Sequence, residues 1–414
     1  MAGLQTVRGT HDLVGEELKK HQFIEETIEK VVQTYGFSGL ITPIFEFTDV
    51  FARSLGETTD VVTKEMYSFT DKGGESLTLR PEGTAGVVRA FISLGLQQNL
   101  PVKAFYKGPM FRYERPQKGR QRQFHQVGIE LLGVDQPQGD VEVLLAGVDF
   151  LSAIGIYDKV KLEINSLGDK ESRDNYKEKL ISYLKKYETS LSEDSKNRLE
   201  KNPLRVLDSK DDKDRDIVLN APLFSDSLND ESKKFFDEVL SSLTDLGVKY
   251  ELNQRLVRGL DYYSHTAFEF TTTELGSQGT VLGGGRYNGL VKQMGGSDVS
   301  GIGWAAGVER LAMMIADYPQ DIRPITVVPM GSEAQKIAMR ISWDLRKSGI
   351  NVDMGYSGNL GKRLKRANKV NAGFAVMIGE DELAKKVCLV RNLDNGEQEE
   401  VSLDSIVAFF ENRR

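Results

Sequence analysis

Two runs of β-forming residues flank a short basic loop in the first third of the chain. VKAFYKGPMFRYE spans 102–114 and FHQVGIELLG spans 124–133, with RPQKGRQRQ between them. This pattern predicts two long strands joined as a hairpin. The loop carries three arginines and one lysine, although the chain has a formal net charge of −7. Because a guanidinium fork matches phosphate oxygens, the loop fits a polyphosphate or an RNA end, with a solvated turn as the alternative.

Alternation along the second strand separates an apolar face from a polar one. The apolar face is expected in the core and comprises His125, Val127, Ile129 and Leu131. Gln126 and Glu130 point the other way with Gly128 between them, which leaves room for a ligand on the sheet. On the preceding strand, Arg112 and Glu114 also share a face. A solvated face of an antiparallel sheet is the alternative, but it does not account for the glycine.

Length and composition narrow the class of protein. A chain of 414 residues predicts two to three domains. The single cysteine, Cys388, allows no internal disulfide and suits a reducing cytosol, so a cytoplasmic protein is expected. The N-terminal residues lack a signal-peptide pattern, and no apolar run approaches the roughly 20 residues that span a membrane. The four histidines show no ligand spacing, so no protein-held metal is expected.

Helical and β patterns alternate in the body of the chain. Apolar spacing predicts an amphipathic helix over about 16–35, ended by Gly36. FSGLITPIFEF (37–47) is predicted as one strand that is edge-like at its proline. LTLRPEGTAGVVRAFISLG (77–95) predicts a strand, a turn and a helix, and a further helix is expected over 142–155.

Two later segments differ from this body. The stretch from about 170 to 223 is highly charged and shows no wide apolar face, so it is predicted to be a solvated helical insertion. From Pro324 onward, strand and helix patterns alternate with short loops. That alternation predicts an α/β domain of about 90 residues.

Two further motifs carry chemistry-bearing residues. In RGLDYYSHTAFEF, Arg258 precedes a glycine and can reach into a site, while Tyr262 and Tyr263 offer hydroxyl groups. Packing of paired tyrosines at the edge of a core is the alternative. GTVLGGGRYNGL (279–290) lacks the GK[ST] ending of a phosphate-binding P-loop, so its glycines indicate turns or close backbone approach.

Taken in order, these segments resemble the bacterial-type histidyl-tRNA synthetases, which are class II aminoacyl-tRNA synthetases. The segments that carry the resemblance are TLRPEGTAGVVRA, GPMFRYERPQKGRQRQFHQVGIELLG, RLVRGLDYY, GSQGT with GGRYNGL, and GVERL. The resemblance covers nearly the whole chain. It implies an α+β catalytic domain over 1–323, with an antiparallel sheet flanked by helices and a helical insertion at about 170–225. It also implies an anticodon-binding α/β domain over 324–414 and a homodimer formed through FSGLITPIFEF.

The resemblance further implies an activity and the residues that serve it. ATP would activate L-histidine to histidyl-adenylate, with Mg²⁺ carried by the ATP, and the histidyl group would pass to the 3′ end of histidine tRNA. The implied catalytic residues are Arg112 and Arg258, which flank the α-phosphate. The implied histidine-binding residues are Glu82, Thr84, Gln126, Glu130, Tyr262 and Tyr263. The implied ATP-binding residues are Arg112, Glu114, Arg120, Phe124 and Arg310. The residues implied at the tRNA acceptor end are Arg115, Gln117 and Arg122.

Two alternatives belong to other classes of function. A catalytically inactive, histidyl-synthetase-like regulatory protein would bind histidine or a partner enzyme without charging tRNA. Such a protein is expected to lack the C-terminal domain or the catalytic arginines, and Arg112, Arg258 and Arg310 are all present. A generic RNA-binding module would account for the cations but not for Glu82 and Glu130.

Overall fold

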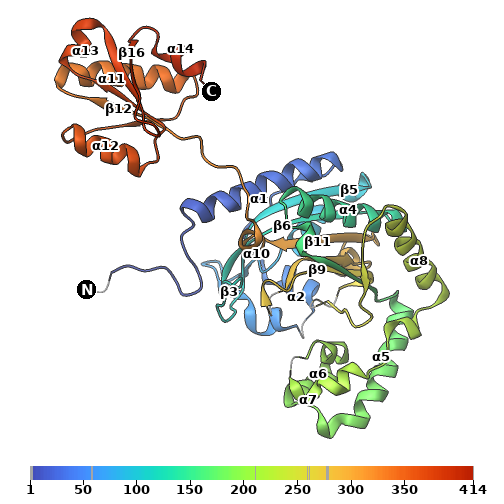
Figure 1. Ribbon diagram of the computed structural model, residues 1–414. Coiled ribbons are helices and arrows are strands. Elements are labelled where there is room, and N and C mark those ends of the chain that lie inside the picture. The colour runs from blue at the N-terminus through green and yellow to red at the C-terminus, as the bar shows by residue number, and fades with distance from the viewer. Residues whose placement is uncertain are drawn as a thin grey trace. The chain divides into compact units, whose positions relative to one another are not determined.

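The protein is described by a computed structural model that covers residues 3–56, 59–209, 211–258, 260, 262–276 and 279–413. The chain divides into two compact units, Met1–Tyr318 and Pro319–Arg414. Each unit has its own sheet and its own apolar core (Figure 1).

A large, mainly antiparallel sheet forms the centre of the first unit. Its spatial order is β1 (Ser38–Gly39), β5 (Val102–Phe111), β6 (Gln123–Leu132), β11 (Gly301–Gly307), β10 (Thr280–Arg286), β9 (Ser264–Thr271), β7 (Lys161–Ser166) and β8 (Glu251–Leu252). Among the described strands of this sheet, only the two edge pairs, β1 with β5 and β7 with β8, run parallel. The hairpin predicted around the basic loop is confirmed, because β5 and β6 pair antiparallel from Val102–Leu132 to Phe111–Gln123.

Four helices cover one face of this sheet and build the largest core (Figure 1). They are α1 (Gly15–Thr34), α4 (Pro137–Ala153), α8 (Asp230–Asp245) and α10 (Val308–Met314). The buried stripe of α1 is His21, Ile24, Ile28 and Val32, with the spacing of one helix face. The helix ends as predicted at Gly36 (φ 79°), where the amides of Gly36 and Phe37 bond back to Gln33 and Val32.

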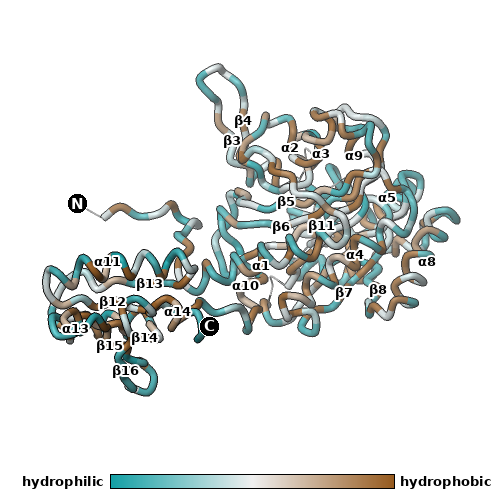
Figure 2. The backbone as a smooth tube through the Cα atoms, turned by 90° about the horizontal axis from the view of Figure 1, so that it is seen from above, coloured by the Kyte–Doolittle hydropathy of each residue, from teal (hydrophilic) through white to brown (hydrophobic). Residues whose placement is uncertain are grey.

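The opposite face of the sheet carries shorter elements. They are α2 (Thr48–Leu55), the π-turn η1 (Val61–Glu65), α3 (Thr84–Ser93), η2 (Leu96–Gln98), α9 (Leu290–Gln293) and a small sheet ordered β2 (Phe45–Phe47), β4 (Ser76–Leu79), β3 (Tyr67–Thr70). The hairpin tip between β3 and β4 is hydrophilic in Figure 2. The prediction of one continuous strand over 37–47 is wrong. That segment forms β1 in the large sheet and β2 in the small one, so it turns from one sheet to the other around Pro43.

The prediction of a helical insertion is confirmed, but the prediction that it is solvated and lacks a core is wrong. Its elements are α5 (Lys170–Leu184), η4 (Lys185–Ser190), α6 (Glu193–Lys201), η5 (Pro203–Asp208), α7 (Asp212–Leu219) and η6 (Phe224–Ser227). Tyr176, Leu180 and Leu184 lie four residues apart on α5 and are fully buried. They pack with Phe224, with Leu191 just after η4 and with leucines of α6 and η5, so the charged sequence still holds an apolar core.

The second unit confirms the predicted alternation of strands and helices. Its five-stranded sheet has the order β13 (Val352–Met354), β12 (Ile325–Pro329), β14 (Phe374–Ile378), β15 (Val387–Asn392), β16 (Gln398–Ser402). The helices are α11 (Ser332–Lys347), α12 (Leu360–Lys369), α13 (Glu380–Lys385) and α14 (Ile406–Glu411). Parallel pairing of β12 with β13 and β14 follows from the helical crossovers, whereas β15 and β16 pair antiparallel.

Candidate active site

A cavity opens on the face of the large sheet opposite α1 and α4. Every residue predicted to take part in catalysis, histidine binding or ATP binding lines it: Glu82, Thr84, Arg112, Glu114, Arg120, Phe124, Gln126, Glu130, Arg258, Tyr262, Tyr263 and Arg310. The polar face of β6 contributes Gln126 and Glu130, as strand alternation predicts. The apolar face of β6 holds Val127, Ile129 and Leu131 in the core.

One end of the cavity is a buried set of carboxylates and hydroxyls. Glu82 accepts hydrogen bonds from the backbone amides of Thr84 and Ala85, each at 2.7 Å, at the start of α3. The hydroxyl of Thr84 donates to Oε1 of Glu130 at 2.6 Å, and that of Tyr287 donates to Oε2 at 2.6 Å. Both carboxylates are therefore fixed in position, and each retains lone pairs for a further donor.

Burial dominates the electrostatics at this end. It raises the pKa of Glu130 to about 8, against the opposing effect of its hydrogen bonds to Thr84 and Tyr287. Burial also raises the pKa of Glu82, although the amides at the start of α3 oppose that shift. The four surrounding tyrosines are buried as well: Tyr106, Tyr262, Tyr263 and Tyr287. The end of the cavity is thus a low-dielectric site that favours a cationic or hydrogen-bonding ligand.

Glycines make this packing possible. The space above Gly128 is filled by the ring of Tyr106, its cross-strand partner on β5, so the prediction that Gly128 leaves room for a ligand is wrong. Gly303 on β11 leaves space for the carboxylate of Glu130. On β10, a Cβ at Gly283 would lie 2.8 Å from Nη1 of Arg258. Close backbone approach, one of the two readings of the glycine-rich motif, is therefore confirmed at Gly283.

The other end of the cavity is rich in arginine. Nε of Arg112 donates to the carbonyl of Pro81 at 2.8 Å, and Arg258 forms an ion pair with Glu269. Arg310 donates to the carbonyls of Thr280 and Gly119 at 2.7 and 3.1 Å.

Their charges lie close enough to influence one another. The pKa of Arg310 is lowered first by burial and then by the charge of Arg120. Arg120 in turn lies 2.6 Å from Glu114 in an ion pair. Several guanidinium groups around one hollow form a site for a polyanion.

The basic loop lies partly outside this cavity: Gly119, Arg120 and Gln121 line it, whereas Arg115, Gln117 and Arg122 do not. Arg115 and Gln117 are exposed, and Gln117 pairs with Arg120 through two backbone hydrogen bonds. The guanidinium of Arg122 lies 3.9 Å from the ring centroid of Tyr113, and its Nε donates to the carbonyl of Glu114 at 3.2 Å. Arg122 therefore holds the loop together, in addition to any role at its surface.

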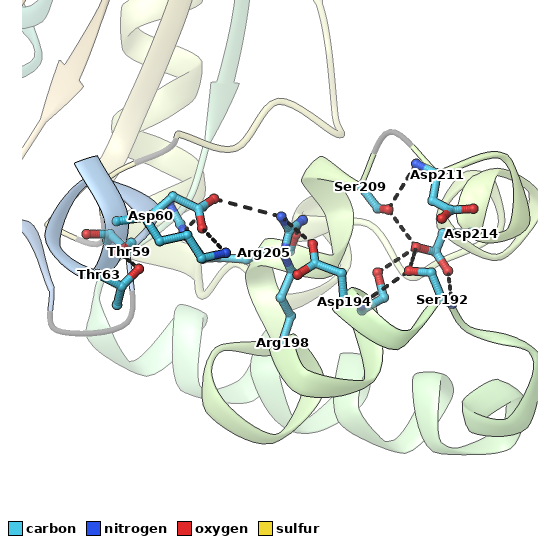
Figure 3. Close-up of polar contacts among 12 residues, drawn as sticks. Thr59, Asp60, Thr63, Ser192, Asp194, Arg198, Arg205, Ser209, Asp211 and Asp214 are labelled. Atoms are coloured by element: carbon cyan, nitrogen blue, oxygen red, sulfur yellow. Dashed lines mark hydrogen bonds and ion pairs between the residues drawn. The ribbon is translucent and has the colours of Figure 1, made fainter. Parts of the chain in front are cut away.

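A second hollow continues from the cavity toward the helical insertion. It is bordered by Arg112, Arg120 and Arg258 from the sheet side and by Arg198, Arg205 and Ser209 from the insertion. Asp60, just before η1, lies 3.7 Å from Arg205 and 3.9 Å from Arg198 in ion pairs that join the two parts (Figure 3).

Inside the insertion, a buried carboxylate gathers hydroxyl groups. Asp214 accepts hydrogen bonds from the hydroxyls of Ser192, Ser195 and Ser209 and from the backbone amide of Ser192 (Figure 3). This cluster fixes the wall of the second hollow.

Two residues of these sites do not appear among those predicted from sequence. Tyr287 belongs to GGRYNGL and comes directly after β10, and its hydroxyl reaches Glu130, which lies 157 residues away in the chain. Asp60 is one acid among many in the sequence. Neither position carries a local pattern that marks it.

Comparison with known proteins agrees with this geometry. The model of the histidyl-tRNA synthetase family matches residues 9–311, and that of the anticodon binding domain matches residues 325–413. The chain is 58% identical over 410 residues to a histidine–tRNA ligase of Rhodospirillum rubrum, covering 99% of each chain. It is 54% identical to that of Gluconacetobacter diazotrophicus over 409 residues, again with 99% of each chain covered.

Solved structures give the same result. The crystal structure of apo S. aureus histidyl-tRNA synthetase matches with a TM-score of 0.83 and 37% identity, covering 99% of this chain and 100% of that one. A structure titled an ATP phosphoribosyltransferase regulatory subunit/histidyl-tRNA synthetase, from Bacillus halodurans, is 18% identical with a TM-score of 0.65, covers 91% of this chain and 98% of that one, and shares the fold. The chain belongs to the histidyl-tRNA synthetase family.

Proposed function

We propose that the protein is a histidine–tRNA ligase. It condenses L-histidine with ATP to give histidyl-adenylate and pyrophosphate, and then transfers the histidyl group to the 3′ end of histidine tRNA. The observation that carries this proposal is one cavity that has buried carboxylates at one end and arginines at the other. Such a cavity has the charges needed to hold an amino acid beside a nucleotide phosphate, which supports the proposal.

Histidine occupies the buried end in this proposal. Glu82 and Thr84 receive the ammonium group, because a fixed carboxylate is its natural partner. Gln126 and Glu130 bind the imidazole nitrogens, and Tyr262 and Tyr263 close the pocket. A pocket that hydrogen-bonds both nitrogens rejects analogues that lack them by about 10⁴-fold or more.

ATP occupies the arginine end. The carboxylate of histidine attacks the α-phosphorus, the new P–O bond forms, and the bond to pyrophosphate breaks. Arg112 and Arg258 stabilise the charge that develops on the α-phosphate oxygens. Glu114, Arg120, Phe124 and Arg310 hold the nucleotide. ATP brings Mg²⁺ with its phosphates, and no protein-held metal takes part in this step.

The tRNA approaches through the second hollow in this proposal. Arg115, Gln117 and Arg122 contact the acceptor end, and Arg198 and Arg205 of the insertion line its path. The domain over 324–414 binds the anticodon. Its helix α12 carries five cations in the sequence KRLKRANK, of which Arg363 is buried and the others offer contacts to phosphate.

The protein is further proposed to form a homodimer and to act in the cytoplasm. Large apolar side chains lie exposed on and beside β2 and β3: Ile41, Ile44, Phe45, Phe47 and Phe69. The rings of Phe45 and Phe69 lie 6.5 Å apart, so they share one patch that a second copy would cover. Among the described residues, no helix has the length and apolar character needed to cross a membrane.

ATP–pyrophosphate exchange without tRNA, run separately with each of the twenty amino acids, tests the activity. Exchange with histidine alone is expected. The regulatory alternative is not favoured, because Arg112, Arg258 and Arg310 all line the cavity. A folded protein that binds histidine but exchanges with no amino acid would reverse this choice.

A further inference from the structure

Three ligand-type side chains meet on the far side of β6 from the buried end of the cavity. They are His21 of α1, His125 of β6 and Glu309 in the first turn of α10. One nitrogen or oxygen from each lies within 4.8 Å of the others. The two imidazole rings stand edge to face, with centroids 5.4 Å apart.

His21 has no partner that accounts for its burial. Its side chain occupies the apolar stripe of α1 with Ile24 and Ile28, and only 3% of the residue is exposed. Neither ring nitrogen has a hydrogen-bond partner among the described residues. Buried imidazole nitrogens are normally satisfied, so this one points to a group that binds between the three side chains.

His125 and Glu309 are already held in position for such a group. The carboxylate of Glu309 accepts the backbone amide of His125 at 2.9 and 3.0 Å. Nδ1 of His125 lies 2.9 Å from Oε1 of the same carboxylate. The backbone of β6 therefore orients the carboxylate, and the carboxylate orients the ring.

We propose that His21, His125 and Glu309 bind a divalent transition-metal ion of the zinc type. Two imidazoles and one carboxylate are a ligand set that Zn²⁺ takes, with an open fourth position. Ligand distances of about 2.0–2.2 Å place tetrahedral ligand atoms about 3.3 Å apart. The three ligand atoms now lie within 4.8 Å of one another, so small side-chain rotations bring them to that value.

Competing charges around the site are few. Glu17 and Glu25 lie one turn of α1 to either side of His21, and Glu17 is paired with His11 at 3.0 Å. The hydrogen bond that the His125 ring donates to the Glu309 carboxylate raises the pKa of His125.

The site joins α1 and α10 to the sheet next to the nucleotide end of the cavity. Glu309 also borders that cavity, and the neighbouring Arg310 is the proposed nucleotide contact. A metal bound here would fix the start of α10. Metal binding itself does not depend on the proposed function, so it is tested without ATP, histidine or tRNA.

Cobalt absorption provides the test, because Co²⁺ gives visible bands when it replaces Zn²⁺ in a tetrahedral site. The protein is prepared without a histidine tag, stripped with a chelator and titrated with Co²⁺ at about pH 8, where unperturbed imidazoles are neutral. One equivalent is expected to produce the bands, and Zn²⁺ is expected to abolish them. His21→Ala is expected to weaken Co²⁺ binding by more than about tenfold. The matched control is His11→Ala, which removes an exposed imidazole on the same N-terminal segment.

X-ray absorption at the zinc edge of the wild-type protein loaded with Zn²⁺ is a second test, and it does not depend on whether a variant folds. Two imidazoles and one carboxylate in the coordination sphere are expected. The proposal is overturned if stripped wild-type protein gives no band at excess Co²⁺. It is also overturned if His21→Ala, folded by circular dichroism, binds Co²⁺ like the wild type.

Discussion

Gly303 on β11 lies opposite Glu130 on β6, and Oε2 of Glu130 occupies the space where a Cβ atom of residue 303 would stand. The carboxylate can reach Thr84 and Tyr287 only because this position has no side chain. A glycine in one strand therefore sets the position of an acid in the next.

Gly303→Ala is expected to push the Glu130 carboxylate away and to raise the KM for histidine in ATP–pyrophosphate exchange by at least about tenfold. The reason is the loss of a positioned acceptor, and a buried group left without its hydrogen-bond partner costs about 1–3 kcal/mol. The matched control is Gly361→Ala on α12 of the second unit, where the nearest atom to a Cβ is Oδ1 of Asn359 at 3.7 Å. An unchanged KM in Gly303→Ala would show that the carboxylate of Glu130 does not contact histidine.

Glu130 also predicts how stability changes with pH. Burial raises its pKa from 4.5 to about 8 in the folded protein, so between these values the folded state keeps a proton that the unfolded state has lost. The free energy of unfolding of the ligand-free protein is expected to fall as the pH rises from about 4.5 to 8. Glu130→Gln is expected to flatten that slope, and thermal unfolding across this range measures it.

Glu82 contributes to the same pH dependence, and an exposed glutamate provides the control. Burial raises the pKa of Glu82 as well, which leaves part of the slope in Glu130→Gln. Glu188→Gln, at an exposed position, is the control and is expected to keep the wild-type slope. If Glu130→Gln keeps the full wild-type slope, a group other than Glu130 causes the pH dependence of the free energy of unfolding.

The sequence predicted much of this cavity because its signals are local. Strand alternation separates Gln126 and Glu130 from the apolar Val127 and Ile129 without any knowledge of neighbouring strands. The same reasoning failed at Gly128, where it predicted room for a ligand. The ring of Tyr106 fills the space above Gly128, because Tyr106 is its partner on the neighbouring strand. The sequence of one strand does not encode which residues pair with it.

Other features depend on contacts between distant segments. His21, His125 and Glu309 come from three elements, so no ligand spacing marks them in the chain. The core of the insertion had a local signal in Tyr176, Leu180 and Leu184, at four-residue spacing. The surrounding charges obscured it, because a narrow apolar stripe is enough when several short helices share one core.

Arg258→Lys tests whether the arginine end of the cavity supports the reaction. Lysine preserves the charge that pairs with Glu269 but lacks the planar fork that fits phosphate. Exchange is expected to fall by about 10²–10³-fold in kcat, with histidine affinity changed only slightly. Arg340→Lys, at a highly exposed position of the second unit, is the control. Exchange at the wild-type rate would remove Arg258 from the proposed catalytic residues.

Substitutions in the basic loop are expected to affect adenylate formation and tRNA charging differently. Arg115→Ala is expected to impair charging alone, whereas Arg122→Ala is expected to impair both steps. Arg115→Ala removes an exposed cation, so tRNA charging is expected to drop by about tenfold or more while exchange stays normal. Arg122→Ala also removes the contact with Tyr113 and the hydrogen bond to the carbonyl of Glu114. Because Glu114 lines the cavity, the rates of both ATP–pyrophosphate exchange and tRNA charging are expected to fall in that variant. Equal loss of both steps in Arg115→Ala would contradict the proposed role of the loop.

Asp214 is expected to determine the stability of the insertion. Its buried carboxylate accepts hydrogen bonds from Ser192, Ser195 and Ser209, so Asp214→Ala leaves two buried hydroxyls and one half-buried hydroxyl without their shared acceptor. Each unsatisfied group costs about 1–3 kcal/mol, which is enough to unfold the insertion locally while the large sheet stays folded. Hydrogen exchange is expected to rise across α6 and α7 and to stay unchanged in β5 and β6. Asp216→Ala, at an exposed position of the same helix, is the control. If protection in α6 survives Asp214→Ala, the apolar core around Leu180 and Phe224 alone holds the insertion together.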